Sequence, residues 1–252
     1  MTISKIEDAI AAMARGGMIL VVDDEDRENE GDIIVAADAV TPEAINFMMM
    51  HARGLICIAM EGRRLDELDI PLMVPRNTES HKTAFTVSVD YLPGTSTGIS
   101  AADRAATVRA LIDPKSVPAD FGRPGHVFPL RAHPNGVLGR PGHTEAAVDL
   151  TRMAGRFPSG VICEVANDDG SMARLPELLI FAEKHQIPLV TIRDLISFIG
   201  SHTITDVADL ALSEFVHRTG SSKFERELAV HGSKQRAHSN RFTADTTRLE
   251  TH

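Results

Sequence analysis

The sequence predicts an α+β protein in which helices cover a mixed β-sheet. Short apolar runs typical of buried strands interleave with amphipathic stretches of helical period along residues 3–199. These elements do not follow the strict β-α-β repeat that a parallel sheet requires. The chain has 252 residues, of which 43% are hydrophobic and 24% charged, so it has the length and the apolar content to bury a substantial core.

The first predicted elements enclose an acidic loop. Residues 3–14 carry apolar side chains at helical spacing, and the glycine pair at 16–17 ends this helix. A continuous apolar run at 18–22 predicts a buried strand, and the run at 32–37 predicts a returning strand. The acids between the two runs are therefore expected at the ends of strands.

The next predicted helix has a clear beginning. Residues 41–52 start with Thr41 as N-cap and Pro42 at the first helical position, and an apolar stripe follows. The apolar run at 55–60 predicts a strand, and residues 63–70 predict a short helix that ends before a proline.

Residues 84–90 alternate between apolar and polar side chains, as a half-buried strand does. A loop rich in hydroxyl groups and glycine, at 93–100, leads into a helix at 101–112 with Ser100 as its cap. The remaining predicted elements are short strand or helix starts at 126–132 and 148–150, strands at 160–165 and 187–192, and a helix at 176–185.

Residues 1–200 are predicted to form the folded domain, and residues 201–252 a C-terminal extension. Within the extension, residues 205–218 suit one more amphipathic helix. From Thr219 onward the chain is polar, mixed in charge and poor in apolar residues. Such a composition cannot bury enough surface to offset the entropy of ordering, so we expect this end to be flexible.

The composition argues against two classes of partner. A formal net charge of -9 does not suit a nucleic-acid binder, since phosphate binding needs a basic face, and the chain has no Trp and one Tyr for stacking on bases. No apolar run approaches the length of about eighteen residues that predicts a membrane span. The N-terminal segment contains acids and is amphipathic, unlike a signal peptide, so a cytoplasmic location is expected.

Both cysteines lie within short apolar runs. Cys57 follows GLI and Cys163 follows GVI, and such positions are typical of small buried hydrophobic residues. We therefore expect neither a disulfide scaffold nor a cysteine zinc site.

The segment DDEDRENEGD, residues 23–32, contains seven acids and a single countercharge, Arg27. Like charges at about 4 Å repel by roughly 1 kcal/mol even in water, so the loop needs either open solvent or a cation. An EF-hand starting at Asp24 is excluded, because Asn29 and Val35 stand where that motif needs Gly and Glu. A solvated turn and a site for a hard divalent cation such as magnesium both remain possible from the residues alone.

The segment HTEAAVDL, residues 143–150, is predicted to enter a helix with His143 just outside and Thr144 as the cap. Together with Arg140, such a helix N-terminus would suit an anion. The alternative is an ordinary cap beside a surface histidine.

Glu164 interrupts the apolar strand at 160–165. A lone buried carboxylate is strongly disfavoured, so its side chain must be paired, face a cavity or point to solvent. Burial would raise its pKa and suit it to proton transfer near neutral pH.

Several segments in one order resemble the 3,4-dihydroxy-2-butanone 4-phosphate synthases of riboflavin biosynthesis, from about residue 3 to residue 199. The resemblance rests on DDEDRENEGD, STGISAADR, RPGHVFPLRA, GHTEAAVDL and GVICE followed by NDDGSMAR. It implies a three-layer α/β/α sandwich, a homodimer with active sites near the subunit interface, and a cytoplasmic carbon–carbon lyase. The implied cofactor is Mg²⁺ or Mn²⁺, with no organic cofactor because no hydride is transferred.

The resemblance also assigns residues. Glu28 and His143 are implied to hold the metal, and His126 and Glu164 to be needed for catalysis. The implied substrate contacts are Arg27, Glu28, Asp32, Arg140, Pro141, Gly142, His143, Thr144 and Glu164. Within this set we expect Arg140 and Thr144 to bind the phosphate, and Asp32, His126 and Glu164 to move protons. Cys57 resembles a family position near the substrate.

The implied reaction converts D-ribulose 5-phosphate to 3,4-dihydroxy-2-butanone 4-phosphate and formate. It would proceed through a metal-stabilised enediol, loss of the C1 hydroxyl, a skeletal rearrangement and excision of C4. A metal-dependent sugar-phosphate isomerase or aldolase would use similar residues and is the alternative enzyme. A sugar-phosphate or RNA-binding module without activity is disfavoured by the acidic loop. Some family members continue into a GTP cyclohydrolase II domain with three zinc-binding cysteines, which this sequence is not expected to contain.

Overall fold

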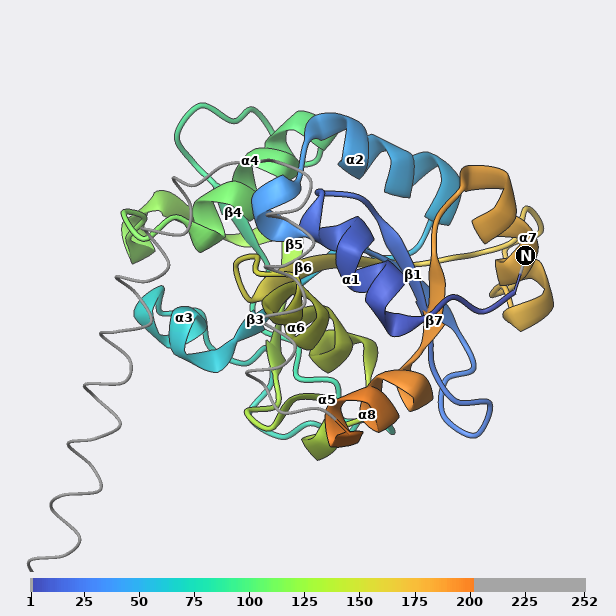
Figure 1. The fold of residues 1–252 in the computed structure, drawn as a ribbon. Helices are drawn as coiled ribbons and strands as arrows, with labels where there is room; N and C mark the ends of the chain where they lie inside the picture. Colours follow the sequence, from blue (N-terminus) through green and yellow to red (C-terminus); the bar gives the residue numbers. More distant parts are fainter. Residues whose placement is uncertain (1, 202–252) are drawn as a thin grey trace, which may run out of the picture. The chain divides into compact units, whose positions relative to one another are not determined.

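The structure, a computed structural model, describes residues 2–201 (Figure 1). At its centre lies a seven-stranded sheet in the order β4-β5-β3-β6-β2-β1-β7. In that order the strands span Val89–Tyr91, Phe121–Ala132, Cys57–Glu61, Ser159–Glu164, Gly31–Ala36, Ile19–Val22 and Leu189–Thr191. The pairs β5–β3 and β1–β7 are parallel, and the other neighbours are antiparallel. The predicted mixed sheet is confirmed.

Helices cover both faces of this sheet, which gives the three layers that the resemblance implied. On one face lie α1 (Ile6–Ala14), α5 (Gly136–Gly139), α6 (His143–Met153) and α8 (Ile192–Ser201). On the other face lie α2 (Pro42–Phe47), the π-helical turn η2 (Met48–Ala52), α3 (Gly62–Glu67), α4 (Ala101–Ile112) and α7 (Leu175–His185). Figure 1 shows α1 beside α6 in front of the sheet and α2 beside α4 at the top of the view.

The two cores follow from the alternation of side chains along the strands. In β1, Ile19 and Val21 pack on the face of α1 and α6, whereas Leu20 and Val22 pack on the face of α2 and α7. All four side chains are buried, as is usual for a strand covered on both faces. The continuous apolar runs of the sequence are explained by this double burial.

Two predicted helix caps are confirmed. The hydroxyl of Thr41 accepts a hydrogen bond from the N–H of Ala44 at 3.2 Å, and that of Ser100 accepts one from the N–H of Asp103 at 3.0 Å. The helix predicted at 41–52 ends in the π-helical turn η2.

The strand predicted at 84–90 is wrong over most of its length. Only β4, at Val89–Tyr91, forms a ladder with β5, while Phe85 and Thr86 make isolated bridges. Thr86 donates its N–H to the carbonyl of Pro129 at 3.0 Å, but proline has no N–H to return. The pairing that does form shifts register between Val89 and Asp90.

Other boundaries differ in smaller ways. The strand predicted at 187–192 is confirmed as β7, but it is followed at once by α8, which the sequence analysis did not predict. Residues 126–132 belong to the longer strand β5, and residues 148–150 to helix α6. The helix predicted at 205–218 and the flexible end predicted from Thr219 onward lie outside the described residues. The predicted domain boundary at residue 200 lies at the edge of the described part. Within residues 2–201, no helix is long and apolar enough to cross a bilayer.

Candidate active site

A pocket of about 430 Å³ lies where the loop between β1 and β2, the end of β6 and the start of α6 meet. Asp32 on β2 and Glu164 on β6 are direct partners in the antiparallel ladder, so the sheet itself brings these two acids together. The lining residues are Arg27, Glu28, Glu30, Asp32, Cys57, Glu79, His81, Thr83, Phe85, Leu130, Arg140, His143, Thr144, Ile162 and Glu164. The pocket therefore gathers most of the predicted site residues.

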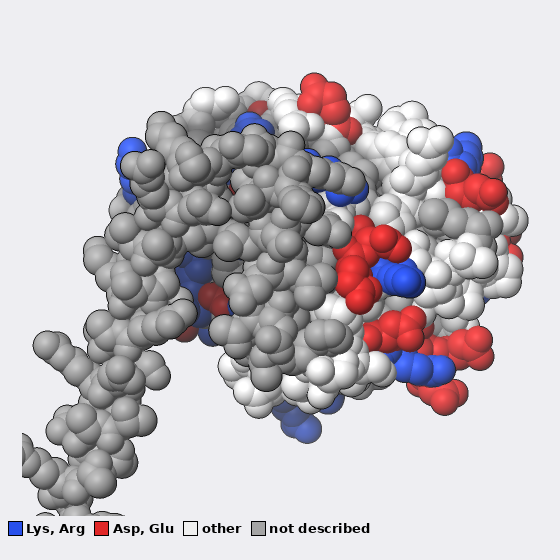
Figure 2. Space-filling model, viewed as in Figure 1, with Lys and Arg blue, Asp and Glu red and all other residues white. Residues whose placement is uncertain are grey.

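The acidic loop is organised around Asp23, whose side chain is buried. One carboxylate oxygen accepts the Arg27 guanidinium at 2.8 Å and the N–H of Glu28 at 3.1 Å, and the other accepts the N–H of Glu30 at 2.8 Å. Three donors compensate the buried charge and fold the loop back on itself. Glu25 and Asp26 instead lie exposed, and Figure 2 shows red side chains gathered at the lower right over this loop.

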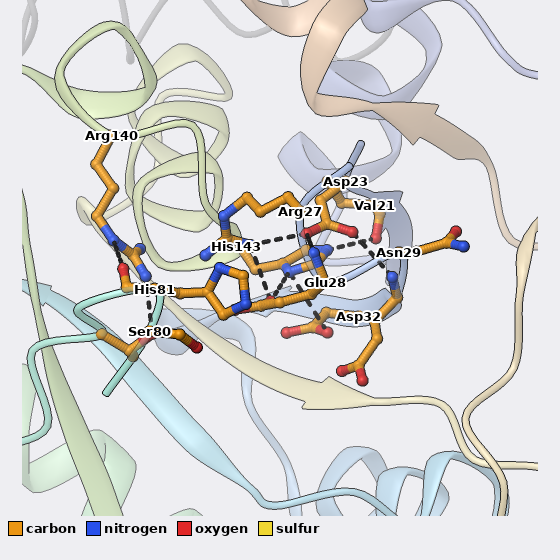
Figure 3. Close-up of polar contacts among 12 residues, drawn as sticks. Val21, Asp23, Arg27, Glu28, Asn29, Asp32, Ser80, His81, Arg140 and His143 are labelled. Atoms are coloured by element: carbon orange, nitrogen blue, oxygen red, sulfur yellow. Dashed lines mark hydrogen bonds and ion pairs between the residues drawn. The ribbon is translucent and has the colours of Figure 1, made fainter. Parts of the chain in front are cut away.

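Arg27 and Glu28 form an ion pair at the pocket wall. The Nη1 of Arg27 lies 2.8 Å from the Glu28 carboxylate and equally close to Asp23 (Figure 3). Arg27 thereby holds the Glu28 side chain in one orientation, directed at His143. Of the two alternatives for this loop, a solvated turn does not describe the half that contains Asp23, Arg27 and Glu28.

The structure corrects the prediction for His143. The residue is the first of helix α6, Gly142 is the N-cap, and Thr144 lies inside the helix rather than capping it. Gly142 is extended, with φ -121° and ψ 164°, as an N-cap residue is. His143 is buried, so it is not a surface residue.

The ring of His143 has a defined orientation. Its Nε2 lies 3.1 Å from the carbonyl oxygen of Val21, which can only accept, so Nε2 carries the donated proton. The Nδ1 atom faces the carboxylates of Glu28 at 3.5 Å and Asp32 at 3.8 Å. Histidines that bind metals commonly donate their second ring N–H to a carbonyl in this way.

These residues fit a divalent cation. Among the described residues, ligand atoms of Asp23, Glu28 and His143 lie within 4.8 Å of one another. Asp23 already accepts three hydrogen bonds, so Glu28 and His143 are the better ligands of this set. The adjoining Oδ1 of Asp32 is buried without a hydrogen-bond partner, an arrangement that a cation or a bound hydroxyl group would relieve. Carboxylate oxygens that leave room for water suit Mg²⁺.

The charges of the pocket shift one another's ionisation. Burial raises the pKa of Asp32 well above its ordinary range, although nearby His143 opposes this shift. Burial works to lower the pKa of His143, but Asp32, Glu28 and Asp23 together raise it above its usual 6.5. Burial likewise opposes ionisation of Glu28, but its bond to His143 and the charge of Arg27 bring its pKa to about 2. The metal-free pocket thus favours an ionised Glu28 beside a protonated His143.

Arg140 lies at the opposite wall. Its guanidinium pairs with the buried carboxylate of Glu145 at 2.7 Å and donates to the Thr83 hydroxyl at 2.7 Å and the His81 carbonyl at 3.2 Å. Three of its five N–H groups are used, which leaves two for a ligand. A Cβ on Gly142 would lie 2.3 Å from Nη1 of Arg140, so a larger residue there would displace this guanidinium.

Glu164, the last residue of β6, lines the pocket. One of its carboxylate oxygens accepts the N–H of Leu55 at 2.8 Å, and the side chain is partly buried. A Cβ on Gly54 would lie 2.4 Å from the same carboxylate, which shows how closely the backbone approaches. Of the alternatives open for Glu164, a side chain that faces a cavity is confirmed.

His126 is not among the residues that line this pocket. It lies on β5, next to the edge strand β4, with its side chain 43% exposed. Its Nδ1 is 2.7 Å from the Asp90 carboxylate, which also accepts the His126 N–H at 2.8 Å. The structure therefore does not bring His126 together with the other predicted residues within one subunit.

One wall of the pocket was not predicted from the sequence. Glu79, His81, Thr83 and Phe85 line it, and the ring of His81 points inward in Figure 3. Their only signal is the polar segment RNTESHKT before the alternating run, which is typical of any surface loop. Both cysteines are free and buried as predicted, and Cys57 also reaches the pocket, as the resemblance implied.

Comparison with known proteins agrees with this geometry. The sequence profile of the 3,4-dihydroxy-2-butanone 4-phosphate synthase family matches residues 7–198. A protein of that name from Agrobacterium fabrum is 71% identical over 207 residues, which cover 82% of this chain and 97% of the relative. The riboflavin biosynthesis protein RibBA of Bacillus subtilis is 58% identical over 193 residues, or 77% of this chain and 48% of the relative, so this chain matches about half of that longer protein.

The solved structures agree as well. A 3,4-dihydroxy-2-butanone 4-phosphate synthase in complex with two magnesium ions superimposes with a TM-score of 0.76 at 44% identity, over 79% of this chain and 97% of that one. The profile match, the identity and the shared fold extend over the same segment that forms the pocket. The chain belongs to the 3,4-dihydroxy-2-butanone 4-phosphate synthase family.

Proposed function

We propose that this chain converts D-ribulose 5-phosphate to 3,4-dihydroxy-2-butanone 4-phosphate and formate, as a carbon–carbon lyase of riboflavin biosynthesis. The observation that supports this best is the convergence of Glu28, Asp32 and His143 in one pocket, with Glu164 beside Asp32 in the ladder. This arrangement joins a cation site to two further carboxylates that can move protons.

Glu28 and His143 would hold Mg²⁺ or Mn²⁺. When bound, such an ion acts as a Lewis acid that stabilises negative charge on substrate oxygens, which an enediol requires. The chain's own contribution is the orientation of both ligands, through Arg27 for Glu28 and the Val21 carbonyl for His143. No organic cofactor is proposed, because none of the steps transfers hydride.

Arg140 and Thr144 would bind the substrate phosphate. Arg140 retains two N–H groups, and Thr144 lies in the first turn of α6, where backbone N–H groups have no acceptor within the helix. Pro141 and Gly142 join these two residues and would place the phosphate between them. Arg27 would contact the opposite end of the sugar, because it lies at the wall that carries Glu28.

Asp32 and Glu164 would move protons between substrate carbon and oxygen atoms. Burial raises the pKa of Asp32 from its ordinary acidic value toward neutral pH. A general acid or base works best when its pKa lies near the pH of the reaction. Glu164 keeps a free carboxylate oxygen while the other accepts the Leu55 N–H. Each could take a proton from the substrate and return it at a neighbouring position.

His126 would act across the interface of a homodimer. It lies outside the pocket of its own subunit, yet Asp90 fixes its ring so that Nε2 remains available for proton transfer. Leu92 and Ile99, near the same sheet edge, are 57% and 50% exposed, which suits a surface that a second subunit covers. A cytoplasmic location remains a prediction.

The product distinguishes this proposal from its alternatives. We expect the protein with ribulose 5-phosphate and Mg²⁺ to release formate and a four-carbon phosphate, and EDTA to stop both. A sugar-phosphate isomerase would give another pentose phosphate without formate, and an aldolase would give two smaller fragments other than formate. A binding module would leave the substrate unchanged, so any of these three outcomes contradicts the proposal.

A further inference from the structure

Arg174 lies outside the pocket and is an exposed residue. It is the last residue of the segment NDDGSMAR and the N-cap position of α7, where its N–H donates to the Glu177 carboxylate at 3.1 Å. Helix α7 packs beside the acidic loop, since Leu178 fills the space over Gly31. The side chain of Arg174 can therefore reach the loop from the surface.

The guanidinium of Arg174 binds the backbone of the acidic loop. Its Nη1 donates to the carbonyl of Glu28 at 2.9 Å and to the carbonyl of Asn29. Asn29 has a positive φ of 54°, a conformation that costs energy for a residue with a side chain. The two bonds fall on the turn that directs the Glu28 side chain toward His143.

We propose that Arg174 is a positioning residue that fixes the backbone of Glu28 and so preorganises the metal site. The inference rests on the proposed function insofar as Glu28 is a metal ligand. Asp23 holds the N–H groups of Glu28 and Glu30 from inside the loop, and Arg174 holds the carbonyls of Glu28 and Asn29 from outside. The peptide units before and after Glu28 are thereby both held, the first through its N–H and the second through its carbonyl.

The segment before Arg174 is itself held in place. Ala166 pairs with Met172, and the N–H of Ala173 donates to the carbonyl of Val165 at 2.9 Å. Arg53 donates to the Ala166 carbonyl at 3.0 Å and pairs with Asp168. This short hairpin directly follows β6, so the segment from Glu164 to Arg174 carries both an acid of the pocket and the residue that orients Glu28.

The test measures the binding of Mn²⁺ alone to the full chain after removal of metals. Arg174→Met keeps the aliphatic stem but removes both hydrogen bonds, and we expect the dissociation constant for Mn²⁺ to rise by about 10-fold, as for other residues that orient metal ligands. Arg193→Met is the matched control, because Arg193 touches the same loop through the side chain of Asp24. Its pair is exposed, so we expect a change below about twofold.

Two further readouts separate positioning from a structural role. The melting temperature of metal-free Arg174→Met should equal that of the wild type within about 2 °C, because the side chain is exposed. In the assay, the metal concentration for half-maximal rate should rise while the rate at saturating metal is largely kept. Arg174→Lys, which can still donate to both carbonyls, should recover most of the Mn²⁺ affinity.

Glu28→Gln distinguishes the failure of this inference from failure of the proposed function. If Glu28→Gln binds Mn²⁺ as the wild type does, the proposed metal site is wrong. If Glu28→Gln loses binding but Arg174→Met binds as the wild type does, the site stands and the role of Arg174 is overturned. Equal losses in Arg174→Met and Arg193→Met would also overturn it, because any contact with the loop would then have the same effect.

Discussion

The Nδ1 atom of His143 faces the carboxylate of Glu28 at 3.5 Å, while its Nε2 lies 3.1 Å from the carbonyl of Val21. The fold thus fixes the orientation of the ring, with Nε2 toward the Val21 carbonyl and Nδ1 toward the acids. Glu28 comes from a loop between two strands and His143 from the first turn of a distant helix, so only the tertiary structure unites them. The following predictions test what this pair does.

Glu28→Gln should abolish metal binding while the metal-free fold is kept. The amide preserves the size of the side chain but removes the charge that a divalent cation needs, so we expect activity to fall by at least about 100-fold. Activity and Mg²⁺ affinity are the measurements. Glu25→Gln removes an exposed acid of the same loop and should leave both nearly unchanged. Equal losses in the two variants would mean that the loop acts only through its total charge.

Stabilisation by Mg²⁺ should grow with pH. In the metal-free protein the surrounding acids raise the pKa of His143 above 6.5, although burial opposes them. Because the pKa is raised, protonation of His143 stabilises the metal-free fold fully below about pH 6.5. This contribution is lost as the pH rises through the raised pKa of the folded state. A histidine that binds a metal must have lost its extra proton, so Mg²⁺ displaces this proton and binds more tightly as the pH rises. The rise in melting temperature on addition of about 10 mM Mg²⁺ should be larger at about pH 8 than at about pH 6. A pH-independent rise would contradict His143 as a ligand.

Heterodimers should show whether His126 acts across the interface of the proposed homodimer. We expect His126→Ala and Glu28→Gln to be inactive as homodimers. A heterodimer purified through two different tags would contain one site with neither substitution if His126 serves the partner's pocket, and should regain about half of the wild-type activity. If His126 serves its own pocket, both sites carry a substitution and the heterodimer stays inactive.

Gly31→Ala should destabilise the domain. A Cβ at this position would lie 2.5 Å from Cδ1 of Leu178, which is fully buried and has little room to move. Overpacking of this kind costs about 1–3 kcal/mol, measurable by urea unfolding. Gly200→Ala is the control, because a Cβ there meets nothing within 4 Å, and its helix should be unchanged or slightly stabilised. A Gly31→Ala variant as stable as the wild type would show that Leu178 can rearrange.

The fold could be predicted where local patterns decide it. The caps of Thr41 and Ser100 and the apolar runs of β1, β3 and β6 depend on neighbouring residues alone. Strand order could not be predicted from the residues, because it depends on contacts between segments far apart in the chain. The strand at 84–90 failed for the same reason, since its partner places Pro129 where a donor would be needed.

The site was predictable in part, chiefly through its resemblance to a family. The acidic loop indicated either open solvent or a cation, but its sequence could not show that Asp23 faces inward and organises the turn while Glu25 faces solvent. His81 and Arg174 carry no local signal, because each acts only through a segment that the fold brings close. His143 lines the pocket, but it was placed on the wrong side of the helix boundary.

The central claim is that the pocket excises C4 of ribulose 5-phosphate with the help of a metal held by Glu28 and His143. The most direct measurement uses substrate labelled with carbon-13 at C4, in the presence of Mg²⁺, and follows the products by NMR. We predict that the label leaves entirely as formate, that the four-carbon phosphate is unlabelled, and that EDTA or Glu28→Gln prevents both. Label retained in a four-carbon or five-carbon phosphate would contradict the account.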